Sequence, residues 1–283
     1  MRTFLATILG FGAVCASLFA VPAMWVERNI VNEDGYVELV APLASDPDFQ
    51  GELARTLSDQ LVQHLGASGS VGDVAGAATD RVALKVTELD GYGAAWEETQ
   101  RRSHLAMFGD PTDLPAELDQ TSRFVVDIGP LGTLVIDEVN DMLPVTLTAP
   151  EQILVPMSGA AQPRILETLR ELPPKAYAAT TAVALLTLLS LLVARRRATT
   201  LAWLGLGALA VAGILALLTE GVLIGIVRDN AGASTLGGRL QELIIDTATA
   251  SFDTWLVTLA IGGGVALVAG VAGGVLASRG AAA

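Results

Sequence analysis

Four long apolar segments constrain this chain more than any other feature of its sequence. They cover residues 4–26, 176–194, 200–219 and 254–277, and none contains Asp, Glu, Lys, Arg or His. An apolar run of about 18 or more residues without charge is typical of a membrane-spanning helix. The composition agrees, because only 17% of the residues are charged, whereas soluble domains contain about one quarter. The sequence therefore predicts an α-helical membrane protein with four transmembrane helices.

The charged residues predict how these helices are oriented. Arg195, Arg196 and Arg197 separate the second and third apolar segments, and Lys and Arg concentrate in short cytoplasmic segments. With these arginines in the cytoplasm, both termini are cytoplasmic, and residues 27–175 and 220–253 are extracytoplasmic. The cytoplasmic pieces then hold five basic residues and no acidic residue, while all 30 acidic residues lie outside. We therefore expect a plasma-membrane protein with a strongly acidic extracytoplasmic part.

This topology divides the chain into eight parts. They are an N-terminal transmembrane anchor (1–26), an extracytoplasmic domain (27–175), a second span (176–194), a cytoplasmic arginine-rich loop (195–199), a third span (200–219), a short extracytoplasmic helical segment (220–253), a fourth span (254–277) and a cytoplasmic tail (278–283). An alternative for the first segment is a signal peptide cleaved near Val21-Pro22-Ala23. The apolar core of a signal peptide usually has about 7–15 residues, and this run is longer, which favours an anchor.

The extracytoplasmic domain is expected to be α+β and mostly helical, with a small sheet. Helices are predicted at 33–44, 47–65, 73–89, 92–108, 131–142 and 164–172, and strands at 123–128, 145–148 and 153–156. The second helix has the clearest pattern, with apolar residues at four-residue steps from Phe49 to Leu65 behind an Asp46-Pro47 start. In the segment 220–253, Gly237-Gly238 predicts a break before an amphipathic helix at 239–250. That helix is expected to pack on the domain or at the lipid surface.

Several short stretches resemble a family of uncharacterised actinobacterial integral membrane proteins. They are Trp25-Val26-Glu27-Arg28-Asn29, Tyr36-Val37, Ala41-Pro42-Leu43-Ala44-Ser45-Asp46-Pro47, and Val126-Asp127-Ile128-Gly129-Pro130-Leu131, which is similar to a V-D-L-G-P-L motif of the family. The family motif W-x-x-A-N-R-x-A-H is matched here at Trp96, Arg101 and His104, while Thr99, Gln100 and Ser103 depart from it. The resemblance implies an actinobacterial cell envelope and a membrane-tethered helical domain. It implies no activity.

The matched residues Trp96, Arg101, His104 and Asp127 are the candidate interaction or structural residues of the domain. Arg101 and His104 are three residues apart, so they share a helix face if this segment is helical. The functional interpretation is a binding or acid–base site. The structural one is a buried aromatic ring beside an arginine and a histidine that pair with carboxylates of the domain. The sequence favours the second interpretation.

Small residues at Gly262, Ala266, Gly270 and Gly274 recur every four residues in the fourth apolar segment. Such a stripe lets transmembrane helices approach closely. It is expected either to pack against the third segment of the same chain, at Ala208 and Ala212, or to bind a partner or a second copy.

The sequence argues against several classes of function. A net charge of −13 is unsuited to nucleic acid, which requires clustered Lys and Arg. The two histidines and the single Cys15 do not have the spacing of a metal site, so we expect no metal or cofactor. No nucleophile elbow or phosphate loop occurs, so no catalytic residue is assigned. We expect a non-enzymatic envelope protein whose acidic domain interacts with a protein partner or with itself. An accessory subunit of a transporter or envelope-synthesis complex is the alternative, and an envelope enzyme is a third.

Overall fold

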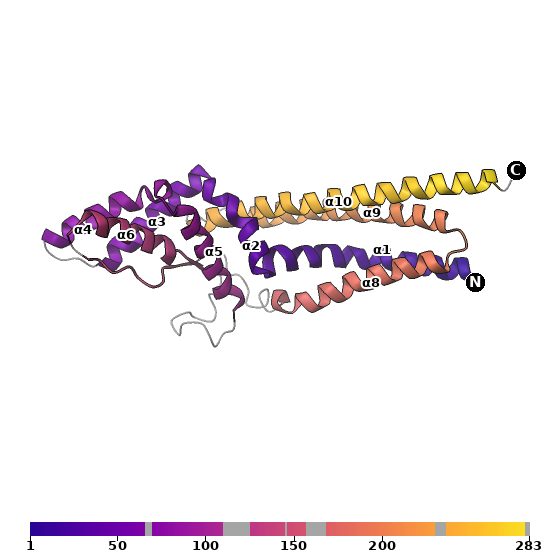
Figure 1. The fold of residues 1–283 in the computed structure, drawn as a ribbon, viewed down its shortest axis with the longest axis horizontal. Helices are drawn as coiled ribbons and strands as arrows, with labels where there is room; N and C mark the ends of the chain where they lie inside the picture. Colours follow the sequence, from indigo (N-terminus) through magenta and orange to yellow (C-terminus); the bar gives the residue numbers. More distant parts are fainter. Residues whose placement is uncertain (66–69, 110–124, 145, 157–167, 230–235, 281–283) are drawn as a thin grey trace. The chain divides into compact units, whose positions relative to one another are not determined.

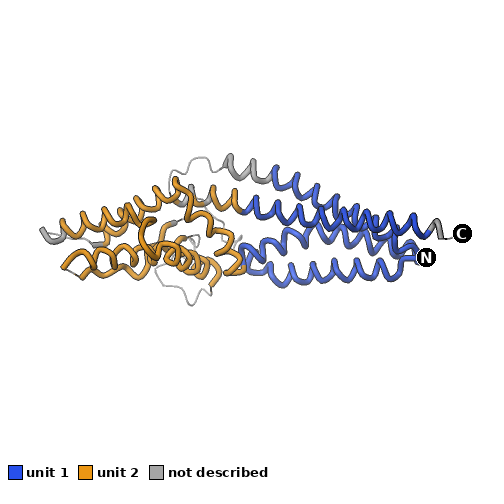
Figure 2. Tube along the Cα trace, turned by 45° about the horizontal axis from the view of Figure 1, so that its top comes forward, with its two compact units in different colours: residues 1–31, 168–228, 248–283 blue, residues 32–167, 229–247 orange. Residues whose placement is uncertain are grey.

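The computed structural model describes residues 1–65, 70–109, 125–144, 146–156, 168–229 and 236–280. These residues form two units (Figure 2). Unit 1 comprises residues 1–31, 168–228 and 248–283, and unit 2 comprises residues 32–167 and 229–247. All four apolar segments fall in unit 1, and most of the acidic residues fall in unit 2. The apolar and polar parts of the chain therefore have separate cores.

Four long helices account for unit 1 (Figure 1). They are α1 (Arg2–Val26), α8 (Leu172–Val193), α9 (Arg197–Asp229) and α10 (Leu236–Gly280), the last of which begins in unit 2. Within the described residues, each contains a stretch long and apolar enough to cross a membrane. This confirms the predicted four apolar helices and makes the chain an integral membrane protein by length and composition.

The connection between α8 and α9 holds the three arginines. Arg195 and Arg196 lie in an exposed turn, and Arg197 is the first residue of α9. In Figure 1 this turn, the N-terminus and the end of α10 lie at the same end of unit 1. The helices of unit 1 thus run alternately up and down.

At its other end, unit 1 is closed by a cluster around Trp25. The Trp25 ring meets that of Phe252 edge-on, with centroids 5.5 Å apart, and the Trp25 Nε1 donates to Ser251 Oγ at 3.2 Å. Nearby, the Tyr177 hydroxyl donates to Glu27 Oε1 at 2.9 Å. Trp25 is buried, and these contacts tie the end of α1 to α10 and the residue that follows α1 to α8. The chain then leaves α1 through one π-helical turn, η1 (Glu27–Val31).

Unit 2 is mostly helical, as predicted. Its elements are α2 (Glu33–Val40), η2 (Ala41–Ser45), α3 (Pro47–Leu65), α4 (Ser70–Ala83), η3 (Val86–Glu88), α5 (Tyr92–Phe108), α6 (Gly129–Met142) and the strands β1 (Val125–Asp127) and β2 (Leu154–Pro156). Polar side chains cap two of the helices, since Asn32 Oδ1 accepts from Gly35 N at 3.0 Å and Asp46 Oδ1 accepts from Phe49 N at 2.8 Å.

The apolar stripe of α3 forms the centre of the unit 2 core. Phe49, Leu53, Leu57 and Leu61 are each no more than 1% exposed, and they pack with the apolar faces of α2, α4, α5 and α6. Burying a side chain of this size stabilises the fold by about 1.5–3 kcal/mol. The stripe read from the sequence therefore identified the main core helix.

The first turns of α10 belong to this core as well. Leu236 and Leu240 are 4% and 1% exposed and pack in the unit 2 cluster. The expectation that the segment 220–253 packs on the domain is thus confirmed for these turns. Residues 239–250 are helical, as predicted, but they do not form a helix distinct from the fourth apolar segment, because α10 is continuous from Leu236 to Gly280. Gly237 and Gly238 lie in its first turn, where backbone N–H groups have no helical partner, so they do not interrupt the hydrogen-bond ladder.

A two-stranded antiparallel sheet completes unit 2, with Val126 opposite Val155. The strand predicted at 145–148 is wrong for residues 146–148, which form no strand. The Asn140 side chain pairs with this segment instead. Its Nδ2 donates to Leu147 O at 3.0 Å and its Oδ1 accepts from Leu147 N at 2.7 Å. Among the positions of predicted helices and strands, residues 123, 124, 145 and 164–167 lie outside the described residues.

Candidate interaction site on helix α5

Helix α5 carries three of the four candidate residues, and one of its faces is unusually polar inside the protein. Thr99, Gln100 and Ser103 are 0% exposed and His104 is 5% exposed. Gly91 precedes the helix at φ 92°, a conformation that glycine adopts without strain. The role of this helix therefore depends on what these buried polar side chains contact.

Trp96 and His104 pack against aromatic rings on the buried side of α5. The Trp96 ring meets that of Phe49 edge-on at 5.3 Å. The His104 ring stacks on Phe108 at 4.7 Å and lies 5.3 Å from the ring of Tyr36. Burial raises the pKa of the Tyr36 hydroxyl above its ordinary value, so this ring remains neutral at physiological pH. His104 therefore belongs to an aromatic cluster.

Arg101 lies on the exposed side of α5 and is surrounded by carboxylates. Its Nη1 is 2.7 Å from Glu33 Oε1 and 3.1 Å from Asp34 Oδ1, and its Nη2 is 3.0 Å from Glu97 Oε1. The hydrogen bond to Glu33, followed by those to Asp34 and Glu97, raises the pKa of Arg101 above its ordinary value. The predicted pairing of this arginine with domain carboxylates is confirmed, and it links α5 to α2.

A groove of about 480 Å³ runs between α2 and α5. Its lining includes three carboxylates, the arginine and two buried side chains. These are Asp34, Glu38, Glu97, Arg101, Trp96 and Gln100. Thus the structure places Trp96 and Arg101 on one groove. His104 does not line it, so the three matched residues do not share one site.

Two side chains in this groove have buried polar atoms without a partner in the described part of the chain. They are Trp96 at Nε1 and Gln100 at both Nε2 and Oε1. A buried polar atom left without a hydrogen bond costs about 1–3 kcal/mol, and such atoms are rare in native proteins. The residues that line the groove therefore include three buried polar atoms that lack a partner among the described residues.

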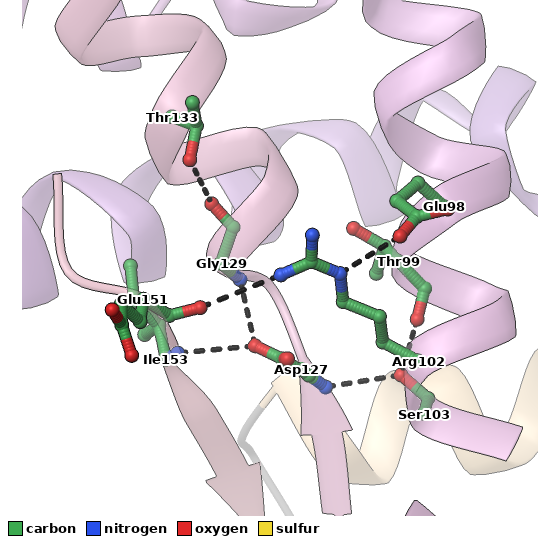
Figure 3. A network of polar contacts seen from close by, with 9 residues as sticks. All are labelled: Glu98, Thr99, Arg102, Ser103, Asp127, Gly129, Thr133, Glu151 and Ile153. Carbon is green, nitrogen blue, oxygen red and sulfur yellow. Dashed lines mark hydrogen bonds and ion pairs between the residues drawn. The ribbon is translucent and has the colours of Figure 1, made fainter. Parts of the chain in front are cut away.

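Asp127 does not line this groove and lies at the end of β1, beside α5 (Figure 3). Its Oδ1 accepts from the backbone N–H groups of Gly129 at 2.9 Å and Ile153 at 3.1 Å. Its own N–H donates to Ser103 Oγ at 3.0 Å, and that hydroxyl donates to Thr99 O at 2.6 Å. Asp127 is 3% exposed. It joins β1 to the start of α6, to the chain just before β2 and to α5, which is a structural role.

Arg102 borders the same network from the exposed side (Figure 3). Its Nε donates to Glu98 Oε1 at 2.9 Å, and its Nη1 reaches Glu151 O at 3.5 Å. Glu98 and Arg102 are four residues apart on a helix, an arrangement that contributes about 0.3–0.5 kcal/mol when exposed. Arg102 thus covers this network and does not line the groove.

In unit 1, the predicted stripe of small residues divides between three environments. Gly270 lies against the α9 backbone, because an added Cβ would be 2.4 Å from Ala202 N. Gly262 and Ala266 line a cavity of about 500 Å³ among the four helices. A Cβ at Gly274 would have nothing within 4 Å. The helix contact instead uses Gly263 and Gly270, with Gly205 of α9.

Of the expected stripe, Gly270 packs against α9, and the contact between α9 and α10 follows a seven-residue spacing for a geometric reason. At about 3.6 residues per turn, four residues advance a helix by about 40° past one turn, while seven residues fall only about 20° short of two turns. Gly263 and Gly270 thus stay on one face, and Gly262 and Gly274 drift off it.

Gln100 and Glu38 were not predicted from the sequence. Gln100 is one of the three positions that depart from the resembled motif, and it lies four residues after Trp96 on the same helix face. A polar side chain on the same helix face as the buried Trp96 was the one feature of the sequence that could have indicated Gln100. Glu38 is one of many carboxylates, and only the fold distinguishes it.

The described residues contain no group of three or more His, Cys, Asp or Glu side chains placed to hold a metal ion. Comparison of the chain with protein-family models, with curated proteins and with solved structures finds no match. The resemblance to an actinobacterial membrane-protein family therefore stays a prediction, and the function is inferred from the site itself.

Proposed function

We propose that this chain is a non-enzymatic cell-envelope protein whose four helices anchor an acidic extracytoplasmic domain that binds another protein or a second copy. The observation that carries this proposal is the groove between α2 and α5. It combines three carboxylates with buried polar atoms that lack partners. Buried anchors inside a polar rim are typical of protein interfaces.

The proposed topology, with unit 2 outside the cytoplasm, is testable with single cysteines. Cys15 is the only cysteine, so Cys15→Ala gives a cysteine-free background. We expect Asp137→Cys, on the exposed side of α6, to react with a membrane-impermeant maleimide in intact spheroplasts. Thr199→Cys, near the arginine turn, should react only after lysis. Labelling in the reverse order would contradict the positive-inside assignment.

The partner is testable by crosslinking in the native membrane. We expect a photo-crosslinking residue at Ala41, an exposed position on the groove, to join the chain to one partner or to a second copy at a defined mass. The matched control is the same residue at Asp137, an exposed carboxylate of α6 without a hydrogen bond or ion pair among the described residues. Adducts that are equal at both positions, or absent at both, would contradict the proposal.

A second candidate is an accessory subunit of a transporter or envelope-synthesis complex. It is favoured by the small-residue position Gly274, where an added Cβ would meet no atom of another helix within 4 Å among the described residues. Small residues on an uncovered face allow a foreign transmembrane helix to approach closely. If a partner protein copurifies through contacts on this face, the chain acts as a subunit of the partner's complex.

A further inference from the structure

Gln100 is the most informative residue of the groove. It is 0% exposed, it lines the groove, and its amide nitrogen and oxygen both lack a partner within the described residues. Trp96, one helical turn earlier, is 3% exposed with its Nε1 also unpartnered. A core position needs neither of these polar groups, since apolar side chains of similar size would fill it without loss. Their chemistry points to a ligand.

The charges of the groove define the ligand further. Arg101 is fully engaged by Glu33, Asp34 and Glu97. Glu38, across the groove on α2, has no ion pair or hydrogen bond among the described residues. The groove and its edge thus hold four carboxylates and one guanidinium. This excess of negative charge attracts cations and repels anionic groups.

We propose that the groove binds a basic segment of a partner protein, with one lysine or arginine side chain placed at Glu38 and a neighbouring peptide group over Trp96 and Gln100. The proposal rests on the proposed function, in which this domain binds a protein. A peptide group supplies the acceptor that Trp96 Nε1 and Gln100 Nε2 require and the donor that Gln100 Oε1 requires. The cation supplies the charge-assisted bond to Glu38.

Other ligand classes fit fewer of these groups. A neutral saccharide would satisfy the amide and the indole but would leave Glu38 uncompensated. A bare metal ion would leave the two donors unpaired. A phosphate or a carboxylate would satisfy the donors but would face the four carboxylates. A basic peptide is the class that uses every feature of the groove.

The experiment uses the full chain in detergent micelles, labelled with 5-fluorotryptophan. Of the four tryptophans, the ¹⁹F resonance that disappears in Trp96→Phe reports on the groove. The probe is N-acetyl-arginine N-methylamide, and N-acetyl-citrulline N-methylamide is its neutral isostere. We expect a saturable shift of the Trp96 resonance by the arginine probe, in the millimolar range of a small ligand, and weaker binding at high salt. The citrulline probe should bind at least about fivefold more weakly.

Variants separate a binding role from a structural one. Glu38→Gln should weaken the arginine probe about fivefold, and Asp137→Asn should leave its affinity unchanged. Gln100→Leu should weaken the probe while leaving thermal stability equal or higher, because it removes two unpartnered polar atoms. A residue kept only for packing would not lose binding and gain stability together.

Equal shifts by the arginine and citrulline probes would overturn the assignment of a basic partner, as would no saturable shift. A shift by N-acetylglucosamine alone would replace it with a saccharide site. If no probe binds to the groove but the chain still crosslinks to a protein through Ala41, this inference is overturned and the proposed function remains. Probe binding without any crosslinked protein would contradict the proposed function and would reduce this inference to a groove that binds a guanidinium group.

Discussion

Replacing Asp127 with alanine should destabilise unit 2 by about 3 kcal/mol, because two buried backbone N–H groups lose their acceptor. These belong to Gly129 and Ile153, which both donate to Asp127 Oδ1. Each buried donor left unpaired costs about 1–3 kcal/mol. The site is 3% exposed, so water does not replace the carboxylate without local opening. The expected result is a lower denaturation midpoint for unit 2 in the detergent-solubilised chain.

Hydrogen exchange locates this effect. The amides of Gly129 and Ile153 should exchange faster in Asp127→Ala, while those of the α3 core should change only with the global stability. Asp127→Asn retains an oxygen that accepts, so its loss should be smaller. Asp137→Ala, in the exposed part of α6, is the matched control and should change stability by no more than about 0.5 kcal/mol. Equal stability of the two alanine variants would show that Asp127 does not hold the strands.

Asp127 also illustrates what a residue pattern predicts and what it does not. The resemblance identified this residue, and its neighbours Gly129 and Pro130 predicted the end of a strand. A separate short strand was predicted at 145–148, in addition to the one at 153–156. In the structure, the backbone of Leu147 is hydrogen-bonded to the side chain of Asn140, seven residues earlier, and not to a neighbouring strand. Side-chain competition of this kind depends on tertiary position, so local propensity does not reveal it.

The helices were more predictable, because each rests on a long periodic or apolar pattern. The four apolar helices follow from segment length alone, and the α3 stripe follows from four-residue spacing. The groove was not predictable in this way. Glu38 and Gln100 are 62 residues apart in number, and only the packing of α2 on α5 brings them to one surface. The unsatisfied state of Gln100 is a property of its surroundings, which the sequence of α5 does not contain.

Packing between the apolar helices makes the second strong prediction. Gly270→Val should destabilise the pairing of α9 and α10 by about 3 kcal/mol. A Cβ at this position would lie 2.4 Å from Ala202 N, 2.6 Å from Ala198 O and 2.8 Å from Ala202 Cα. All three are backbone atoms, so no rotamer change relieves the clash and the helices must separate. Overpacking of this kind costs about 1–3 kcal/mol, and the lost contacts along the helices add to it.

Gly274→Val is the matched control, because it adds the same side chain one turn away, where a Cβ has nothing within 4 Å. In micelles, thermal or SDS-induced unfolding should show a large loss for Gly270→Val and almost none for Gly274→Val. The reverse order would restore the four-residue stripe as the packing face. In the native membrane the same pair separates the two proposed functions. If Gly274→Val releases a copurifying chain without destabilising the isolated protein, α10 docks a partner helix. If both variants keep the same partners, recognition resides in unit 2.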